Sequence, residues 1–244
     1  PGDLETFRRT ALTAIEAGAD RVYIYDGRGW LTPEAISFLV KYLRDLIGAN
    51  KEIAVHCHND FGLATINTIS AIKAGADVVD VTINGLGHRS GNAPFEQVVL
   101  ILEALYDVKT GINIEKITEL CRTVSEQYNV EIPSRWPLVG DNMYTYGGLH
   151  ISAILEGNWY LWETIRAESI GQKRKLVFGE TTLQKDFSSP IAAKMRQMGI
   201  KVTSEKINRA INTLRPLIHR KVNLSESEVE AHLRELFAQE ESIK

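Results

Sequence analysis

The sequence predicts an α/β fold in which helices alternate with parallel strands over the first half of the chain, followed by a mainly helical region. The motif AIEAGAD at residues 14–20 recurs as AIKAGAD at residues 71–77, and each copy leads into an aliphatic segment, 21–25 or 78–83. A third aliphatic segment, 53–58, lies between the two copies. The spacing indicates repeated helix-plus-strand units of the size of a βα repeat.

This alternation predicts a parallel sheet, either closed as a barrel or open with helices on both faces. Three strands are visible, whereas a closed barrel of this kind has eight. In both architectures the functional groups gather at the carboxyl ends of the strands. Four polar residues fall at those ends: Asp26, His56, His58 and Asn84.

The ends of the predicted helices carry recognisable stop and start signals. Gly18 and Gly75 follow runs of helix formers and precede strands, as expected for residues that end helices. Thr32 is a suitable N-cap and Pro33 a suitable first helical residue, so a helix is expected over 33–46.

After Glu96 the strand signals become few. Helices are expected at 114–127, at 204–219, and from a capping box at Ser225 and Glu228 to about Gln239. The segment 136–142 is loop-like. We therefore expect two parts: residues 1–132 with the last three βα units, and residues 133–244 with a linker and a helical subdomain.

The composition excludes several classes of protein. The chain has 244 residues with a formal net charge of −3 and charges of both signs interspersed, so neither a nucleic acid nor a membrane surface is an expected partner. Two cysteines without a paired framework favour a reducing compartment. No signal-peptide pattern and no apolar run of roughly 18 residues is visible, so we expect a soluble, cytoplasmic protein.

His56 and His58 form the first candidate site. Alternate residues of a strand share a face, so the two side chains project the same way about 6.6 Å apart, with Cys57 on the opposite, apolar face. Neutral histidine is the commonest metal ligand, and Asn92 in the next loop adds a small oxygen donor. A pair of hydrogen-bonded polar core residues is the alternative.

The glycine-rich loop that contains Asn92 lacks the spacing of a dinucleotide-binding fingerprint. We expect the glycines to form a tight loop that brings backbone N–H groups and Asn92 close to a ligand. A plain βα turn is the alternative.

Two further groups lie in the second half. By composition alone, His150, Asn158 and Tyr160 are best explained as incidental surface residues. The run KRK at 173–175 is expected to be a solvated turn, with phosphate binding as the alternative.

Taken together, segments 55–64 and 82–94 resemble the isopropylmalate, citramalate and homocitrate synthases, whose metal-dependent TIM-barrel superfamily also contains hydroxymethylglutaryl-CoA lyase. The resemblance extends through 137–142, 148–150 and 177–214. It implies the C-terminal portion of a TIM (β/α)8 barrel, about three strands, followed by an α-helical subdomain.

The resemblance also implies roles for site residues. His56, His58 and Asn92 would be ligands of a divalent metal, Mg²⁺, Mn²⁺ or Zn²⁺. The expected substrate-binding residues at the same ends of the strands are Asp26, Asn84 and Arg89.

His150, Asn158 and Tyr160 match a catalytic trio that, in the citramalate and homocitrate synthases, reaches into the barrel of the neighbouring subunit. They are therefore the expected catalytic residues, with acetyl-CoA as co-substrate and a 2-oxo acid as substrate. A homo-oligomer or a complementing N-terminal chain is the expected partner.

The chain departs from the family pattern at several positions. The strand with the family's Arg-Asp pair, which supplies the fourth metal ligand, is not present in this sequence. Gly27 replaces a threonine, His88 replaces a glutamate, and Tyr146 stands where the family has a histidine.

We therefore expect the C-terminal part of a homocitrate synthase-like acyltransferase, either a fragment or a split subunit, which is inactive without the N-terminal half of the barrel. One alternative is a non-catalytic partner that keeps a relic site. Another is a lyase or aldolase of the same superfamily.

Overall fold

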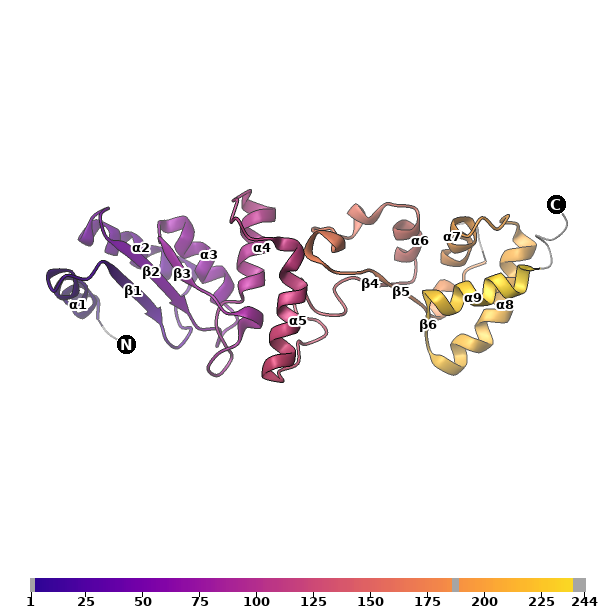
Figure 1. Cartoon of the computed structure of the whole chain (residues 1–244), viewed down its shortest axis with the longest axis horizontal. Helices are drawn as coiled ribbons and strands as arrows, with labels where there is room; N and C mark the ends of the chain where they lie inside the picture. Colours follow the sequence, from indigo (N-terminus) through magenta and orange to yellow (C-terminus); the bar gives the residue numbers. More distant parts are fainter. Residues whose placement is uncertain (1–2, 186–188, 239–244) are drawn as a thin grey trace. The chain divides into compact units, whose positions relative to one another are not determined.

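The computed structural model describes residues 3–185 and 189–238 (Figure 1). The chain divides into two compact units. The first comprises residues 1–132 and 137–139, and the second residues 133–136 and 140–244. Within the described ranges, no helix is both long and apolar enough to cross a bilayer.

The first unit contains a three-stranded parallel sheet in the order β1-β2-β3. The strands are β1 (Arg21–Asp26), β2 (Glu52–Cys57) and β3 (Val78–Asp80). The three predicted parallel strands are confirmed. β3 ends at Asp80, earlier than the predicted residue 83; Thr82 forms an isolated bridge with Pro94, and a 3₁₀ turn follows at Ile83–Gly85. The sheet is open, since β1 and β3 each pair with one neighbour among the described strands.

The helices of the first unit follow the predicted alternation. They are α1 (Leu4–Glu16), α2 (Pro33–Ile47), α3 (Ala64–Ala74), α4 (Phe95–Tyr106) and α5 (Ile117–Tyr128), with a 3₁₀ turn at Ile114–Lys116 before α5. Thr32 caps α2 by accepting a hydrogen bond from the N–H of Ala35, and Gly75 ends α3 in the left-handed region at φ 103°. The predicted start and stop signals are confirmed.

The core of the first unit lies between the sheet and its helices. α2 and α3 pack side by side (Figure 1), and α3 also packs on β2. Ile53, Val55 and Cys57 of β2 are fully buried in this core. Burial raises the pKa of the Cys57 thiol to about 12, so it remains a protonated apolar residue, as predicted. Strand alternation places His56 on the opposite face.

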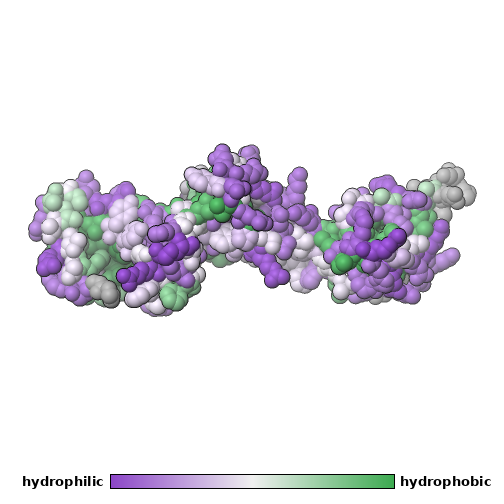
Figure 2. All heavy atoms as spheres, turned by 90° about the horizontal axis from the view of Figure 1, so that it is seen from below, coloured by the Kyte–Doolittle hydropathy of each residue, from purple (hydrophilic) through white to green (hydrophobic). Residues whose placement is uncertain are grey.

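Side chains on that opposite face are less covered. In the face drawn in Figure 2, apolar residues (green) reach the surface between hydrophilic ones (purple). Tyr23 and Tyr25 of β1 are exposed, as is Trp30 in the following loop. A hollow of about 640 Å³ is lined by these three side chains together with Leu4 and Phe7 of the α1 region.

The sequence predicted a mainly helical region here, but the second unit also contains a small sheet. A mixed sheet joins β4 (Thr145–Gly147) and β5 (Lys175–Phe178) in parallel, and β6 (Leu224–Ser225) pairs antiparallel with β5. These strands span two to four residues each. Such short strands give no periodic signal in the sequence.

In the described residues of the second unit, four α-helices and three 3₁₀ turns accompany this sheet. The α-helices are α6 (His150–Leu155), α7 (Pro190–Gln197), α8 (Ser204–Lys221) and α9 (Glu226–Phe237), and the 3₁₀ turns are Trp159–Leu161, Ala167–Ile170 and Glu180–Thr182. The predicted capping box is confirmed, because Ser225 and Glu228 exchange hydrogen bonds at the start of α9. The predicted end of this helix, Gln239, lies outside the described residues.

Candidate metal centre and candidate catalytic segment

The two histidines come together at the carboxyl end of β2. His56 is part of the strand. His58 follows the strand and forms an isolated antiparallel β-bridge with Asn92 through the backbone. The ring centroids of His56 and His58 are 5.0 Å apart. Both imidazoles therefore lie on the same face of the sheet, as the strand alternation predicted.

Each imidazole has one nitrogen with a partner and one without. His56 Nδ1 lies 3.2 Å from Asp80 Oδ2 on β3, and His58 Nε2 lies 3.3 Å from the hydroxyl of Tyr25 on β1. His56 Nε2 and His58 Nδ1 are buried and have no hydrogen-bond partner among the residues that the structure describes. This arrangement is typical of metal-ligating histidines, whose second nitrogen is held by a neighbouring polar group.

Asn92 adds a third buried side-chain atom that lacks a hydrogen-bond partner among the described residues. Its Nδ2 donates to the carbonyl of Leu86 at 3.3 Å, while its Oδ1 is buried and has no partner in the described part of the chain. Gly91 has φ +85°, and a Cβ there would collide with the carbonyl oxygen of Gly85. The loop can therefore close tightly only with glycine at position 91, which supports the predicted role of the glycines.

These three orphaned atoms fit a divalent ion. Two imidazole nitrogens and an amide oxygen suit several divalent metals, including Zn²⁺, Mn²⁺ and Mg²⁺. A buried polar atom without a partner costs about 1–3 kcal/mol, which coordination would offset. In the part of the chain that the structure describes, no group of three His, Cys, Asp or Glu residues forms a ready-made site. The ion would thus receive two imidazoles and one amide from these residues.

The protonation of His58 also favours coordination. Burial lowers the pKa of this imidazole, and the nearby His56 and Arg89 lower it further. A lower pKa keeps the ring neutral at physiological pH, which is the form that binds metal.

Arg89 holds the loops around the candidate metal centre. Its Nε and Nη2 donate to the two carboxylate oxygens of Asp60 at 2.7 and 2.9 Å, and Nη2 also donates to the carbonyl of Gly27 at 2.8 Å. The guanidinium lowers the pKa of Asp60. Arg89, an expected substrate-binding residue, thus already has partners in the loops after β1 and β2.

The other two expected substrate-binding residues, Asp26 and Asn84, differ in whether their side-chain oxygens already accept hydrogen bonds. Both carboxylate oxygens of the buried Asp26 accept backbone N–H bonds, from Trp30 at 2.9 Å and Leu31 at 3.2 Å. Asn84 donates through Nδ2 to the carbonyl of Cys121 at 2.8 Å, and its buried Oδ1 has no partner within the described ranges. Asp26 therefore orders the loop after β1, whereas Asn84 keeps an oxygen available.

The expected catalytic residues lie in the second unit. The Tyr160 hydroxyl is 3.4 Å from Asn158 Oδ1, and Tyr160 is largely exposed. His150, at the start of α6, donates through Nδ1 to the carbonyl of Gly147 at 3.0 Å and packs edge-on against Trp162 at 4.2 Å. A carbonyl can only accept, so His150 Nδ1 donates its proton, and Nε2 is the nitrogen left to face a ligand.

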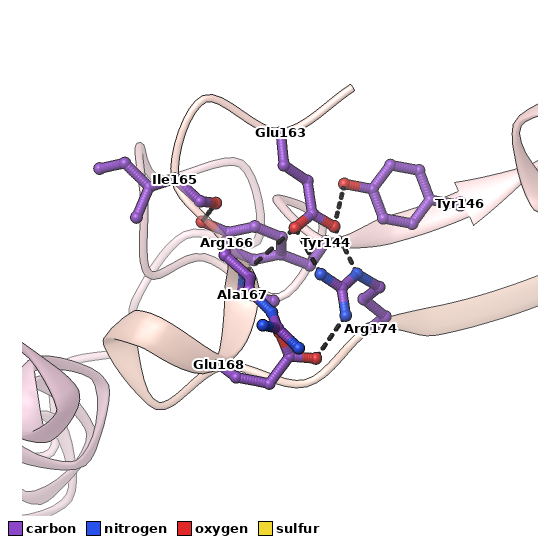
Figure 3. Close-up of polar contacts among 8 residues, drawn as sticks. All are labelled: Tyr144, Tyr146, Glu163, Ile165, Arg166, Ala167, Glu168 and Arg174. Atoms are coloured by element: carbon purple, nitrogen blue, oxygen red, sulfur yellow. Dashed lines mark hydrogen bonds and ion pairs between the residues drawn. The ribbon is translucent and has the colours of Figure 1, made fainter. Parts of the chain in front are cut away.

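A buried ion-pair cluster anchors the segment that carries Asn158 and Tyr160. Figure 3 shows the Glu163 carboxylate between the Tyr146 hydroxyl and the Arg174 guanidinium. Arg174 also pairs with Glu168, and its guanidinium lies 6.0 Å from the centre of the Trp159 ring. The expectation of a solvated turn at 173–175 is wrong for Arg174, because its side chain is only 16% exposed and pairs with a fully buried carboxylate.

Sequence reasoning missed Tyr25, Asp80 and Glu163. Asp80 had a visible signal, since it is an acid directly after two valines in a predicted strand. Its meaning depends on the register that aligns His56 with Asp80 and Tyr25 with His56. That register is a property of the assembled sheet.

The comparisons with known proteins agree with the architecture of the first unit. The HMGL-like family profile matches residues 2–124, and the chain belongs to this family. The first unit is therefore part of a TIM-barrel-superfamily α/β fold. Its open three-stranded sheet fits a partial barrel.

Curated relatives extend the similarity beyond this region. A protein provisionally named (R)-citramalate synthase from Methanopyrus kandleri is 38% identical over 94% of this chain and 44% of its own length. A homocitrate synthase from the same organism is 34% identical over 95% of this chain and 57% of its own length. The chain thus spans about half the length of these relatives.

Among solved structures, the HMG-CoA lyase of Bacillus subtilis is similar, with a TM-score of 0.50 and 29% identity. The match covers 55% of this chain and 47% of the lyase.

Proposed function

We propose that this chain supplies the C-terminal strands of a TIM barrel and the following subdomain of a metal-dependent synthase that condenses acetyl-CoA with a 2-oxo acid. The homocitrate type is the one we favour. The observation that carries the metal part is the set of three buried, unpartnered donors, His56 Nε2, His58 Nδ1 and Asn92 Oδ1. The similarity to citramalate and homocitrate synthases supports the reaction type.

In this proposal His56, His58 and Asn92 hold the ion. When bound, a divalent ion supplies Lewis-acid polarisation of the oxo-acid carbonyl. Asp80 keeps the His56 ring oriented through its hydrogen bond to Nδ1. Asn84 Oδ1, which is buried and unpartnered, is the substrate contact that these residues leave available.

The proton chemistry falls to the catalytic segment, acting on the barrel of a neighbouring subunit. His150 Nε2 is the candidate base that removes a proton from the acetyl-CoA methyl group, with Tyr160 as the second candidate. Asn158, 3.4 Å from the Tyr160 hydroxyl, orients that group. The resulting enolate carbon forms the new bond to the oxo-acid carbonyl carbon; the C=O π bond opens, and the oxygen takes up a proton to become a hydroxyl group. Water then cleaves the thioester and releases the CoA thiol.

The metal part is tested by titrating the full chain with Zn²⁺ and Mn²⁺ in a calorimeter. We expect one ion per chain, with binding abolished in His56→Ala and His58→Ala. Arg122→Ala, a change at an exposed position of α5, is the control and should bind like the parent. A parent chain that binds neither ion contradicts the proposal.

The reaction type is tested by reconstitution. The chain is mixed with a polypeptide that carries the preceding barrel strands, and thiol release from acetyl-CoA is followed with 2-oxoglutarate, pyruvate or 2-oxoisovalerate. We expect release with one of them and its loss in His150→Ala. A lyase would instead cleave a hydroxyacyl-CoA in the same mixture, so both directions are measured.

A non-catalytic partner subunit is the second candidate. Asp26 and Arg89, two expected substrate-binding residues, already have intramolecular partners. This candidate predicts that the reconstituted assembly binds the ion but releases no thiol with any of the three oxo acids.

A further inference from the structure

Tyr25 contacts both histidines of the candidate metal centre. Its ring stacks on the His56 imidazole, with centroids 4.4 Å apart and planes 9° from parallel. Its hydroxyl lies 3.3 Å from His58 Nε2, and the two rings meet edge to face at 5.8 Å. A single phenol thus restrains the orientation of both imidazoles.

Gly27 provides the room for this phenol. Gly27 is not among the glycines with positive φ, so conformational freedom does not explain it. A Cβ at position 27 would lie 2.9 Å from Tyr25 Cε1 and 3.1 Å from Cδ1. Those distances are shorter than ordinary contacts, so a larger residue would push the ring off His56. Tyr25 and Gly27 therefore form a sterically matched pair.

The hydrogen bond to Tyr25 decides which nitrogen of His58 can bind an ion. A neutral imidazole carries its proton on one nitrogen only. When Nε2 holds the proton and donates it to the phenol oxygen, the lone pair of Nδ1 is free, and this is the atom that has no partner in the structure. When Nε2 accepts instead, Nδ1 carries the proton and cannot coordinate.

We infer that Tyr25 is a positioning residue of the metal centre. Its phenol oxygen accepts the Nε2–H of His58, and its ring holds the His56 imidazole, so that the free nitrogens of both rings are presented to one ion. Tyr25 does for His58 what Asp80 does for His56. This inference rests on the metal centre proposed above.

The test compares Zn²⁺ affinity in the full chain and in Tyr25→Phe. Loss of such an outer partner typically weakens metal binding 10–100-fold, and we expect at least about 10-fold. Gly27→Ala, which displaces the ring while keeping the hydroxyl, should weaken binding in the same direction. Tyr23→Phe is the matched control. In the described part of the chain, Tyr23 lies on the same face of β1 but makes no ring contact with either histidine, so the affinity of this variant should equal that of the parent.

Two spectroscopic readouts separate positioning from a general loss of structure. The Co²⁺-loaded Tyr25→Phe chain should show a changed visible absorption spectrum, whereas Tyr23→Phe keeps the parent spectrum. In the metal-free parent at pH 8, ¹⁵N shifts of the His58 ring should place the proton on Nε2.

Three results would overturn the inference. Equal Zn²⁺ affinity in the parent and Tyr25→Phe overturns it and leaves the metal centre standing. A His58 proton on Nδ1 does the same. No Zn²⁺ binding by the parent overturns both the metal centre and the role of Tyr25.

Discussion

Arg174 donates two parallel hydrogen bonds to Glu163, from Nε to Oε1 at 2.6 Å and from Nη2 to Oε2 at 2.8 Å. The Glu163 side chain is fully buried, and it also accepts the backbone N–H of Ala167 at 3.1 Å and the hydroxyl of Tyr146 at 3.0 Å. Arg174 precedes β5, whereas Glu163 follows the turn with Tyr160. The pair therefore ties the expected catalytic segment to the small sheet (Figure 3).

Removal of the Arg174 guanidinium should lower the free energy of unfolding of the second unit. Arg174→Ala leaves the Glu163 carboxylate buried without its cation, and breaking a buried pair in this way costs about 3–5 kcal/mol. Urea unfolding followed by tryptophan fluorescence measures the loss, because Trp159 lies beside both Arg174 and Arg166. Lys173→Ala, at the neighbouring exposed position, should change the unfolding free energy by less than about 0.5 kcal/mol. Similar losses in the two variants would show that the ion pair contributes little.

The glycine-rich loop gives a second prediction, which concerns Asn92. Gly91→Ala forces a Cβ into the carbonyl oxygen of Gly85 at a φ of +85°, so the loop has to open and Asn92 Oδ1 moves away from the histidines. We expect loss of Zn²⁺ binding in a calorimetric titration.

The control for Gly91→Ala is Gly111→Ala. Gly111 also has a positive φ, +76°, but a Cβ there meets nothing within 4 Å. This variant should cost about 1 kcal/mol of stability from backbone strain and leave Zn²⁺ affinity unchanged. Unchanged affinity in Gly91→Ala as well would remove Asn92 from the metal centre.

The capping box of α9 predicts a pH dependence. Lys221, and then the backbone and side chain of Ser225, lower the pKa of Glu228 to about 2. Because the folded pKa is depressed, the stabilisation is complete above the ordinary value of about 4.5 and is lost as the pH falls toward 2. An NMR titration of the Glu228 carboxyl carbon should show a midpoint near 2.

Lys221→Ala should move that midpoint upward, since the lysine is the largest cause of the shift. Lys201→Ala, at an exposed position outside this contact, is the matched control and should leave the midpoint in place. A Glu228 midpoint near 4.5 in the parent would mean that the capping box is open in solution.

Local patterns in the sequence predicted much of the first unit. Strand alternation predicted the common face of His56 and His58, and the glycines predicted the tight loop around Asn92. Both signals lie within a few residues of the side chains concerned. The helix start at Thr32 and the capping box at Ser225 are local in the same way.

The parts that sequence reasoning missed depend on contacts between distant segments. Tyr25 and Asp80 approach the histidines only because β1, β2 and β3 pair in one register. Arg174 was expected in solvent, because its partner Glu163 becomes its neighbour only in the folded second unit. Strands of two to four residues, such as β4 to β6, carry too few residues for a period to be seen.

Val222 offers a stabilising substitution. It ends α8 at φ 69° and ψ −45°, a positive-φ conformation that a β-branched residue rarely adopts, and its side chain is 74% exposed. Such strain costs of the order of 1–3 kcal/mol, whereas glycine adopts the conformation freely. Val222→Gly should therefore raise the free energy of unfolding by about 1 kcal/mol, because the greater freedom of glycine in the unfolded chain offsets part of the relief. Val202→Gly, a change outside the helices at a residue with ordinary φ, is the control and should lower stability. Urea unfolding of both variants measures the difference, and a loss of stability in Val222→Gly would show that the turn after α8 relaxes in solution.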